Sequence, residues 1–211
     1  MDKELYDISV ALGSESCDWP KNLEFTREIA ARIQDGEVCN LSNLHLTTHV
    51  GTHVDTPLHF VDGKQNLNDY PIEHWIRPAH VVSIKDKEAV RPEELKHLDI
   101  KPGDALLFKT ENSVSGRNIS GIFFDDFVDV SPEAAEFCVE KKVGLIGVDY
   151  LSVDRRHDPG FPAHHIILGN GILILEHINL KDVPPGKYTL FCFPLKIHGA
   201  EGAPARAILI R

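Results

Sequence analysis

The segment with the strongest signal in this chain reads His49-Val50-Gly51-Thr52-His53-Val54-Asp55-Thr56-Pro57-Leu58-His59. It places three imidazoles and one carboxylate close together in the sequence, a density that core packing does not require. Imidazole nitrogens and carboxylate oxygens are the usual ligands of hard or borderline divalent cations. The segment therefore predicts a metal-dependent enzyme.

The local conformation of this segment follows from its composition. A spacing of four would put His49 and His53 on one face of a helix, but the intervening and following residues are poor helix formers (Gly51, Thr52, Val54, Thr56 and Pro57). We therefore expect a turn between the two histidines, with Gly51 supplying a backbone conformation or a close approach that a side chain would forbid. Beyond the turn, His53 and Asp55 are two residues apart in extended chain and point to the same side.

These side chains define a first metal site and suggest a second. His49, His53 and Asp55 would give one ion two nitrogens and one oxygen, with positions left open for water. The second oxygen of Asp55 would allow it to bridge two ions about 3.5–4 Å apart. Ligands for a second ion would have to come from residues 163–177. From the residues alone, Glu176 is either ion-paired or a ligand, and His164 and His165 are either surface histidines or ligands.

His59 is the last imidazole of the segment. Pro57 stiffens the chain between Asp55 and His59, which holds the ring near the metal without requiring it to bind the metal. A third metal ligand and a catalytic acid/base are both open interpretations. We favour the acid/base, because an imidazole with a pKa near 6.5 is suited to proton transfer around an activated water.

The whole chain limits the classes of protein to consider. Its 211 residues, 42% of them hydrophobic, fit one globular domain over residues 1–211. A net charge of −10 without any Lys/Arg-rich run argues against nucleic acid. Apolar runs such as Ile172–Leu175 are too short to span a membrane. The four cysteines form no C-x-x-C pair and the first residues are charged, so we expect a reducing, cytoplasmic location without disulfides. No nucleotide-binding motif is present.

The pattern of apolar residues predicts many strands and few helices, an α/β domain in the broad sense without the regular alternation of a doubly wound sheet. The expected strands are 5–12, 25–33, 43–49, 79–84, 105–109, 143–148, 172–175, 188–193 and 206–210. The expected helices are 92–97, 131–142 and 161–168, of which the second has Ser131 as N-cap and Pro132 at its first position. In this scheme His49 lies at the end of a strand. Trp19, Phe60, Tyr70 and Trp75 are candidates to line an apolar pocket. For Trp75, packing in the core is the favoured interpretation.

The histidine-rich segment resembles the H-x-G-T-H-x-D-x-P-x-H signature of the cyclase-like metal hydrolases, which include bacterial kynurenine formamidases and isatin hydrolases. The resemblance extends over most of the chain, through segments 5–9, 144–149, 152–154, 194–197 and 202–206. It implies a swivelling β/β/α domain, in which a small barrel-like mixed sheet is packed against a few helices. It also implies a homodimer or homotetramer.

The resemblance assigns roles to the candidate residues. It implies that His49, His53 and Asp55 are metal ligands, that Asp55 is the bridge, and that His59 is the catalytic imidazole. The formamidase pattern H-x-x-x-L-G-x-G-x-x-x-x-E is matched by His164 and Glu176, whereas His165 falls one position off. Two departures are His177, where formamidases have Asn, and the stretch 17–20, where many carry Trp-Pro-Gly-Asp. The cofactor implied is Zn²⁺, one or two ions, with Mn²⁺ as the alternative.

The function implied is hydrolysis of a C–N amide bond in a small molecule by an arylformamidase of the N-formylkynurenine type. Two alternative functions are also enzymatic: hydrolysis of a cyclic amide or lactam, as in isatin hydrolases, and dehydrative ring closure. The alternative outside enzymes is a metal-dependent binding module. Structural zinc sites are commonly closed and rich in Cys, however, whereas this segment has no Cys and mixes His with Asp, which favours an open, reactive site.

Overall fold

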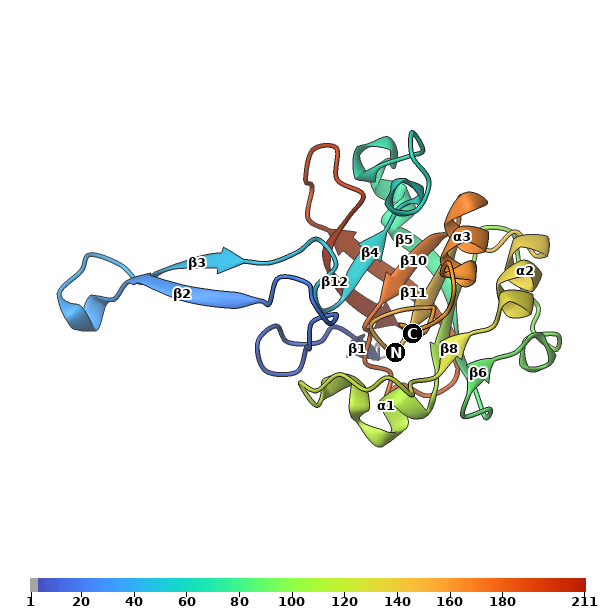
Figure 1. Cartoon of the computed structure of the whole chain (residues 1–211). Helices are drawn as coiled ribbons and strands as arrows, with labels where there is room; N and C mark the ends of the chain where they lie inside the picture. The colour runs from blue at the N-terminus through green and yellow to red at the C-terminus, as the bar shows by residue number, and fades with distance from the viewer. Residues whose placement is uncertain (1–3) are drawn as a thin grey trace.

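The computed structural model, which describes residues 4–211, is built around a mixed β-sheet that closes on itself (Figure 1). Its strands are β1 (Leu5–Asp7), β4 (His53–Asp55), β5 (Ile76–Ser83), β7 (Ala105–Lys109), β9 (Leu145–Val148), β10 (Leu173–Glu176), β11 (Gly186–Pro194) and β12 (Gly202–Ile210). They are ordered β1-β12-β11-β5-β7-β9-β10-β4, and β12 also pairs with β4. Seven strands therefore form a barrel, to which β1 adds at an edge of β12. This confirms the predicted barrel-like mixed sheet.

Four neighbouring strands, β5, β7, β9 and β10, run parallel and are buried on both faces. In β7, for example, Ala105 and Leu107 belong to the cluster inside the barrel, whereas Leu106 and Phe108 belong to the cluster outside it. Burial on both faces explains why β7, β9 and most of β10 read as continuous apolar runs rather than as an alternation.

Helices cover the outer face of the parallel strands. Both α2 (Pro132–Glu140) and α3 (Pro162–Gly169) pack there, and α1 (Glu111–Ser115) follows β7. The Ser131 hydroxyl accepts the backbone N–H of Ala134 at 3.2 Å, as the sequence predicted for the start of α2. The helix expected over 92–97 is only a 3₁₀ turn. The 3₁₀ turns are η1 (Ile33–Asp35), η2 (Pro57–His59), η3 (Leu67–Asp69), η4 (Ile72–Trp75), η5 (Pro92–Glu94) and η6 (Arg117–Ile119).

Two smaller sheets lie outside the barrel. A hairpin of β2 (Thr26–Ala31) and β3 (Leu41–His45) extends away from the body in Figure 1, and β6 (Ala89–Val90) pairs with β8 (Asp129–Val130). The strand predicted over 5–12 ends at Asp7, because beyond it the chain makes only a single bridge, at Ser9. The strand predicted over 43–49 ends at His45, so His49 lies in a turn rather than at a strand end.

The short strand β4 closes the barrel by pairing with both β10 and β12. Val54 belongs to the cluster inside the barrel, so the alternation of side chains turns His53 and Asp55 to the outside. On β10, Glu176 is directly opposite His53. The closing strand thus places three chemically active side chains on the outer face of the β4–β10 seam. None of the helices in residues 4–211 has the length and apolarity of a membrane-spanning segment.

Candidate metal centre

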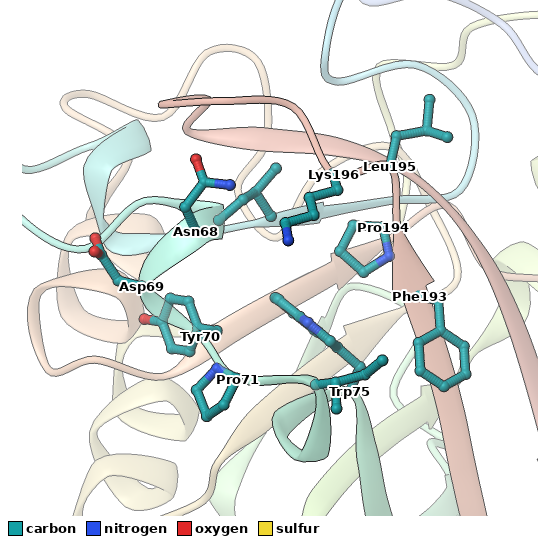
Figure 2. Close-up of a pocket in the computed structure, with 11 residues that line it drawn as sticks. Asn68, Asp69, Tyr70, Pro71, Trp75, Phe193, Pro194, Leu195 and Lys196 are labelled. Atoms are coloured by element: carbon teal, nitrogen blue, oxygen red, sulfur yellow. The ribbon is translucent and has the colours of Figure 1, made fainter.

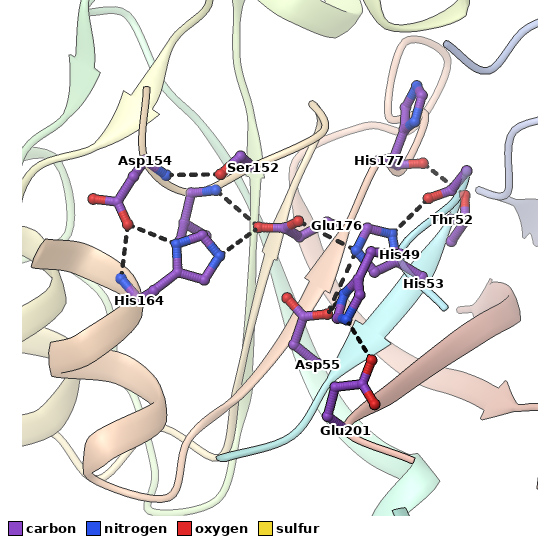
Figure 3. A network of polar contacts seen from close by, with 12 residues as sticks. His49, Thr52, His53, Asp55, Ser152, Asp154, His164, Glu176, His177 and Glu201 are labelled. Atoms are coloured by element: carbon purple, nitrogen blue, oxygen red, sulfur yellow. Dashed lines mark hydrogen bonds and ion pairs between the residues drawn. The ribbon is translucent and has the colours of Figure 1, made fainter. Parts of the chain in front are cut away.

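Donor side chains from separate parts of the chain meet at the outer face of the β4–β10 seam (Figure 3). They come from the turn before β4, from β4 itself, from η2, from the first turn of α3 and from the end of β10. The set is His49, His53, Asp55, His59, His164 and Glu176. The structure therefore brings together all six residues that the sequence singled out.

The first group of donors is His53, Asp55 and Glu176, all of them buried. The Nε2 atom of His53 lies 3.3 Å from Oε2 of Glu176 and 3.5 Å from Oδ1 of Asp55. Two donors bound to one tetrahedral zinc at about 2.0–2.1 Å lie about 3.3–3.4 Å apart, so these separations fit a shared ion. Moreover, Nε2 of His53 and Oδ2 of Asp55 are buried and have no hydrogen-bond partner. Buried polar atoms are rarely left without a partner, which makes a metal the natural partner here.

The second group is His49, Asp55 and His59. Nδ1 of His49 lies 2.7 Å from Oδ1 of Asp55, and the rings of His49 and His59 are stacked with centroids 3.8 Å apart. Asp55 belongs to both groups, as a bridging carboxylate would. His164 belongs to neither, but its Nε2 lies 3.5 Å from Oε1 of Glu176.

The turn between His49 and His53 has the conformation that Gly51 was expected to provide. Its φ is +56°, a conformation that favours glycine, and a Cβ there would lie 2.4 Å from Cδ2 of Leu12, so the Leu12 side chain would have to move. The turn also brings the Gly51 carbonyl within 2.8 Å of Nδ1 of His53. A carbonyl can only accept, so Nδ1 donates and Nε2 is left to bind a metal.

Two carboxylates beyond the donors hold His164 and His49, and sequence reasoning gave neither a role. Asp154 accepts the His164 Nδ1–H at 2.6 Å and also accepts the backbone N–H of His164 at 2.9 Å. Glu201 lies with Oε1 3.2 Å from Nε2 of His49. Asp154 lies well before the start of α3 at Pro162 in the sequence, so no local pattern pointed to its contact with His164. No local pattern pointed to Glu201, whose contact depends on the pairing of β12 with β4.

The buried carboxylates change the protonation of two histidines in the metal-free protein. Burial alone would lower the pKa of His53, but the charges of Asp55 and Glu176 raise it to about 9. Burial would also lower the pKa of His164, but hydrogen bonds to Asp154 and Glu176 raise that pKa to about 10. Without a metal, two imidazolium groups therefore carry the positive charge that the carboxylates favour.

His59 behaves in the opposite way. Burial lowers its pKa to about 4; the nearby His49 and His164 also lower it, while Asp55 opposes the shift. Its imidazole is therefore neutral near pH 7, and one ring nitrogen is free to accept a proton. This is the protonation state that a general base requires.

A pocket of about 240 Å³ lies beside the donors. Phe60 stacks on His164 with ring centroids 4.3 Å apart, so one wall of the pocket is continuous with the donors. Trp19 and Phe60 line this pocket as expected, whereas Tyr70 and Trp75 line a separate groove, and Trp75 is buried as core packing favours. The lining residues are Trp19, Asn22, His49, His59, Phe60, Leu151, Ser152, Phe161, His164 and Glu176.

The two histidines whose contribution the sequence left open are outside the donor groups. His165 is exposed on α3, and its ring packs edge-on against Phe60 with centroids 5.1 Å apart. His177 is buried, and its Nε2 donates to the carbonyl of Asn118 at 2.6 Å. Neither belongs to the two donor groups.

The chain is similar to known proteins over nearly its whole length. The model of the Cyclase family matches residues 6–155. A kynurenine formamidase of Salinibacter ruber is 38% identical over 207 residues, which cover 97% of this chain and 96% of that protein. A solved structure described as a potential metal-dependent hydrolase with cyclase activity has a TM-score of 0.84 at 29% identity, covering 99% of this chain and 98% of the other. Isatin hydrolase A of Labrenzia aggregata shares the fold, with a TM-score of 0.82 at 22% identity, covering 99% of this chain and 93% of the other.

Proposed function

The chain belongs to the Cyclase family, and on this premise we propose that it hydrolyses the formamide C–N bond of N-formylkynurenine or a closely related aryl formamide. It is an enzyme of the metal-dependent amidohydrolase type, as its near full-length likeness to kynurenine formamidases and to metal-dependent hydrolase structures indicates. One observation carries the proposal: two donor groups share Asp55 beside a pocket with aromatic walls.

We propose that two ions bind around Asp55. His49, His53, Asp55, His164 and Glu176 would hold them, and His53, Asp55 and Glu176 form one of the two donor groups. The unpartnered Nε2 of His53 and Oδ2 of Asp55 support this assignment. Zn²⁺ fits a mixture of imidazole and carboxylate donors, and Mn²⁺ is the alternative. When bound, the metal supplies the positive charge that acidifies a water and polarises the amide carbonyl.

The protein's own residues then move the proton and position the substrate. His59, neutral and stacked on His49, would take the proton of the attacking water and return it to the departing amine nitrogen. Trp19, Phe60 and Phe161 would contact the aromatic ring of the substrate and exclude water from it. Asp154 would hold His164 in one orientation through the 2.6 Å hydrogen bond.

Ring opening of a cyclic amide is the second candidate, because the same aromatic pocket of about 240 Å³ suits a bicyclic lactam such as isatin. The reaction also attacks an amide carbonyl and releases an amine. A substrate panel separates the two: the zinc-loaded protein is assayed with N-formylkynurenine, isatin and a simple aliphatic amide. We expect kcat/KM to be highest for N-formylkynurenine. A preference for isatin would assign the ring-opening reaction instead.

The ligand roles are tested by metal analysis of variants. Asp55→Asn should lose both ions, since it belongs to both proposed sites, whereas His49→Ala should lose one. His165→Ala is the matched control, because this histidine is adjacent to His164 but exposed. Full metal retention by Asp55→Asn would contradict the bridging role.

We further propose a location and an assembly for the protein. The described cysteines are all free, and two of them (Cys138 and Cys192) are buried, which supports the proposed reducing, cytoplasmic location. We also propose a homodimer or homotetramer that acts on a small molecule. Size measurements in solution would test the assembly.

A further inference from the structure

The side chain of Glu201 contacts the beginning of the segment 48–59, which we call the donor segment. Its Oε1 accepts the Thr48 hydroxyl at 2.6 Å and lies 3.2 Å from Nε2 of His49, and Figure 3 shows the Glu201 carboxylate pointing toward the His49 ring. The other ring nitrogen of His49, Nδ1, lies 2.7 Å from Oδ1 of Asp55. An ionised carboxylate can only accept, so Glu201 favours the tautomer of His49 with its hydrogen on Nε2, which leaves Nδ1 available to a metal.

The main chain of the same residue contacts the other end of the donor segment. The carbonyl of Glu201 accepts the backbone N–H of Thr56 at 2.9 Å and the hydroxyl of Thr56 at 2.8 Å. Thr56 directly precedes η2, the 3₁₀ turn that ends at His59. Glu201 therefore holds both His49 and the start of the turn that carries the proposed base.

The surroundings of the His49 ring couple its orientation to that of His59. The two rings are stacked with centroids 3.8 Å apart. The edge of the His49 ring lies close to Gly202, where an added Cβ would be only 2.8 Å from Cε1 of His49. The backbone at Gly202 therefore limits movement of the ring on that side, and a rotation of His49 would disturb its contact with His59.

The loop 195–201, which carries Glu201, is itself anchored. The backbone N–H of Gly199 donates to Oδ1 of Asn68 at 2.6 Å. In Figure 2, Asn68 lies at one side of a groove and Leu195, the first residue of the loop, lies at the other. The loop is therefore tied to a separate part of the chain two residues before Glu201, which fixes the position from which the carboxylate reaches His49.

We propose that Glu201 is a positioning residue of the metal centre. It holds His49 with Nε2–H toward its own carboxylate and Nδ1 toward Asp55, and through the stacked rings it keeps His59 in place. Glu201 belongs to neither donor group, so it acts through His49. Loss of a carboxylate that orients a metal-binding histidine reduces metal affinity or activity about 10–100-fold. The inference rests on the proposed metal-dependent hydrolysis, and its test therefore includes measurements that do not require activity.

Two variants at this position separate the hydrogen bonds from the charge. Both side-chain contacts use Oε1, so Glu201→Gln can keep them through its amide oxygen, whereas Glu201→Ala loses both. In competition with a chelator, Glu201→Ala should bind zinc about 10–100-fold more weakly than wild type. At saturating zinc its kcat should fall about 10-fold while KM changes less than about threefold, and Glu201→Gln should stay within about threefold of wild type in every measurement. Glu28→Ala is the control, because Glu28 faces His45 at 3.7 Å on the hairpin β2–β3, outside the site.

The tautomer of His49 is measured directly by NMR of the zinc-loaded protein with ¹⁵N-labelled histidines. We expect the hydrogen on Nε2 in wild type and in Glu201→Gln. A hydrogen on Nδ1 in wild type would overturn the proposal, as would zinc binding by Glu201→Ala within about threefold of wild type. Equal losses in Glu201→Ala and Glu201→Gln would also overturn it, because the hydrogen bonds that Gln keeps would then not account for the effect. If the wild type hydrolyses no formamide, the proposed function fails, but the zinc Kd and the tautomer still decide the role of Glu201.

Discussion

Replacing Asp154 by Asn should weaken metal binding although Asp154 belongs to neither donor group. Oδ2 of Asp154 accepts Nδ1–H of His164 at 2.6 Å and the backbone N–H of His164 at 2.9 Å, and Oδ1 accepts the N–H of Ala163 at 2.8 Å. The amide of Asn has one acceptor oxygen, and an NH₂ donor takes the place of the second carboxylate oxygen, so at least one of these hydrogen bonds is lost. The hydrogen bonds that remain to His164 are then accepted by a neutral amide oxygen instead of a charged carboxylate.

The magnitude follows from these contacts. Loss of a carboxylate that orients a metal-binding histidine reduces metal affinity about 10–100-fold, which corresponds to about 1.4–2.8 kcal/mol. Hydrogen bonds to charged groups contribute about 1.5–3 kcal/mol and neutral ones about 0.5–1.5 kcal/mol, so the metal-free variant should also unfold about 1–3 kcal/mol more easily. The two effects must be separated by a control.

Asp149→Asn is that control. Asp149 is buried like Asp154 and accepts the backbone N–H groups of Thr110 and Ser113 near the start of α1, but within residues 4–211 it forms no hydrogen bond or ion pair with a histidine. Both variants should lose stability in urea unfolding. Only Asp154→Asn should show a weaker zinc Kd in competition with a chelator. If both variants bind zinc within about threefold of wild type, a range below the expected loss, Asp154 is a structural cap and the reasoning is refuted.

Three further predictions concern the site and the fold. His59→Ala should lower kcat by about 10²–10⁴-fold while the metal content of the protein stays unchanged; loss of metal in this variant would make His59 a ligand. Gly51→Ala should weaken zinc binding and raise KM little, because a Cβ at φ +56° would lie 2.4 Å from Leu12 and displace the turn between His49 and His53; an unchanged zinc Kd would show that the turn tolerates the side chain. Burial raises the pKa of Asp129 from 3.8 to about 6, although Arg155 partly opposes the shift. The folded state then binds this proton more tightly than the unfolded state, so the contribution to stability is present below about pH 4 and is lost as the pH rises through about 6. Urea unfolding at several pH values should therefore find Asp129→Asn more stable than wild type at neutral pH, with a gap that closes in acid; a gap that does not depend on pH would contradict the shift.

Local patterns predicted much of the fold. The strands β7, β9 and β10 were predicted because strands that are buried on both faces appear in the sequence as short, continuous apolar runs. The start of α2 was placed at Ser131 because a side-chain cap and a following proline act within one turn. The placement of His53 and Asp55 on one side followed from the geometry of extended chain, and β4 is a strand.

The rest depended on contacts between distant parts of the sequence. Closure of the barrel by β4 between β10 and β12 sets which residues face Glu176, and a three-residue strand has too little pattern to reveal it. The contact of Glu201 with His49 depends on the same closure, whereas the contact of Asp154 with His164 depends on how the loop after β9 folds against the first turn of α3. The end of β3 at His45 was not predicted, because the alternation of side chains continues beyond His45, whereas its partner strand β2 begins only at Thr26, the residue opposite His45.

The most direct test of the two-metal account is the hydrolysis rate of N-formylkynurenine by chelator-treated protein as Zn²⁺ is titrated back, with bound zinc measured at each point. The account predicts that the metal-free protein is inactive and that activity rises to a plateau at two ions per chain. Hydrolysis that persists in metal-free protein, or a plateau at one ion with Glu176→Gln as active as wild type, would contradict it.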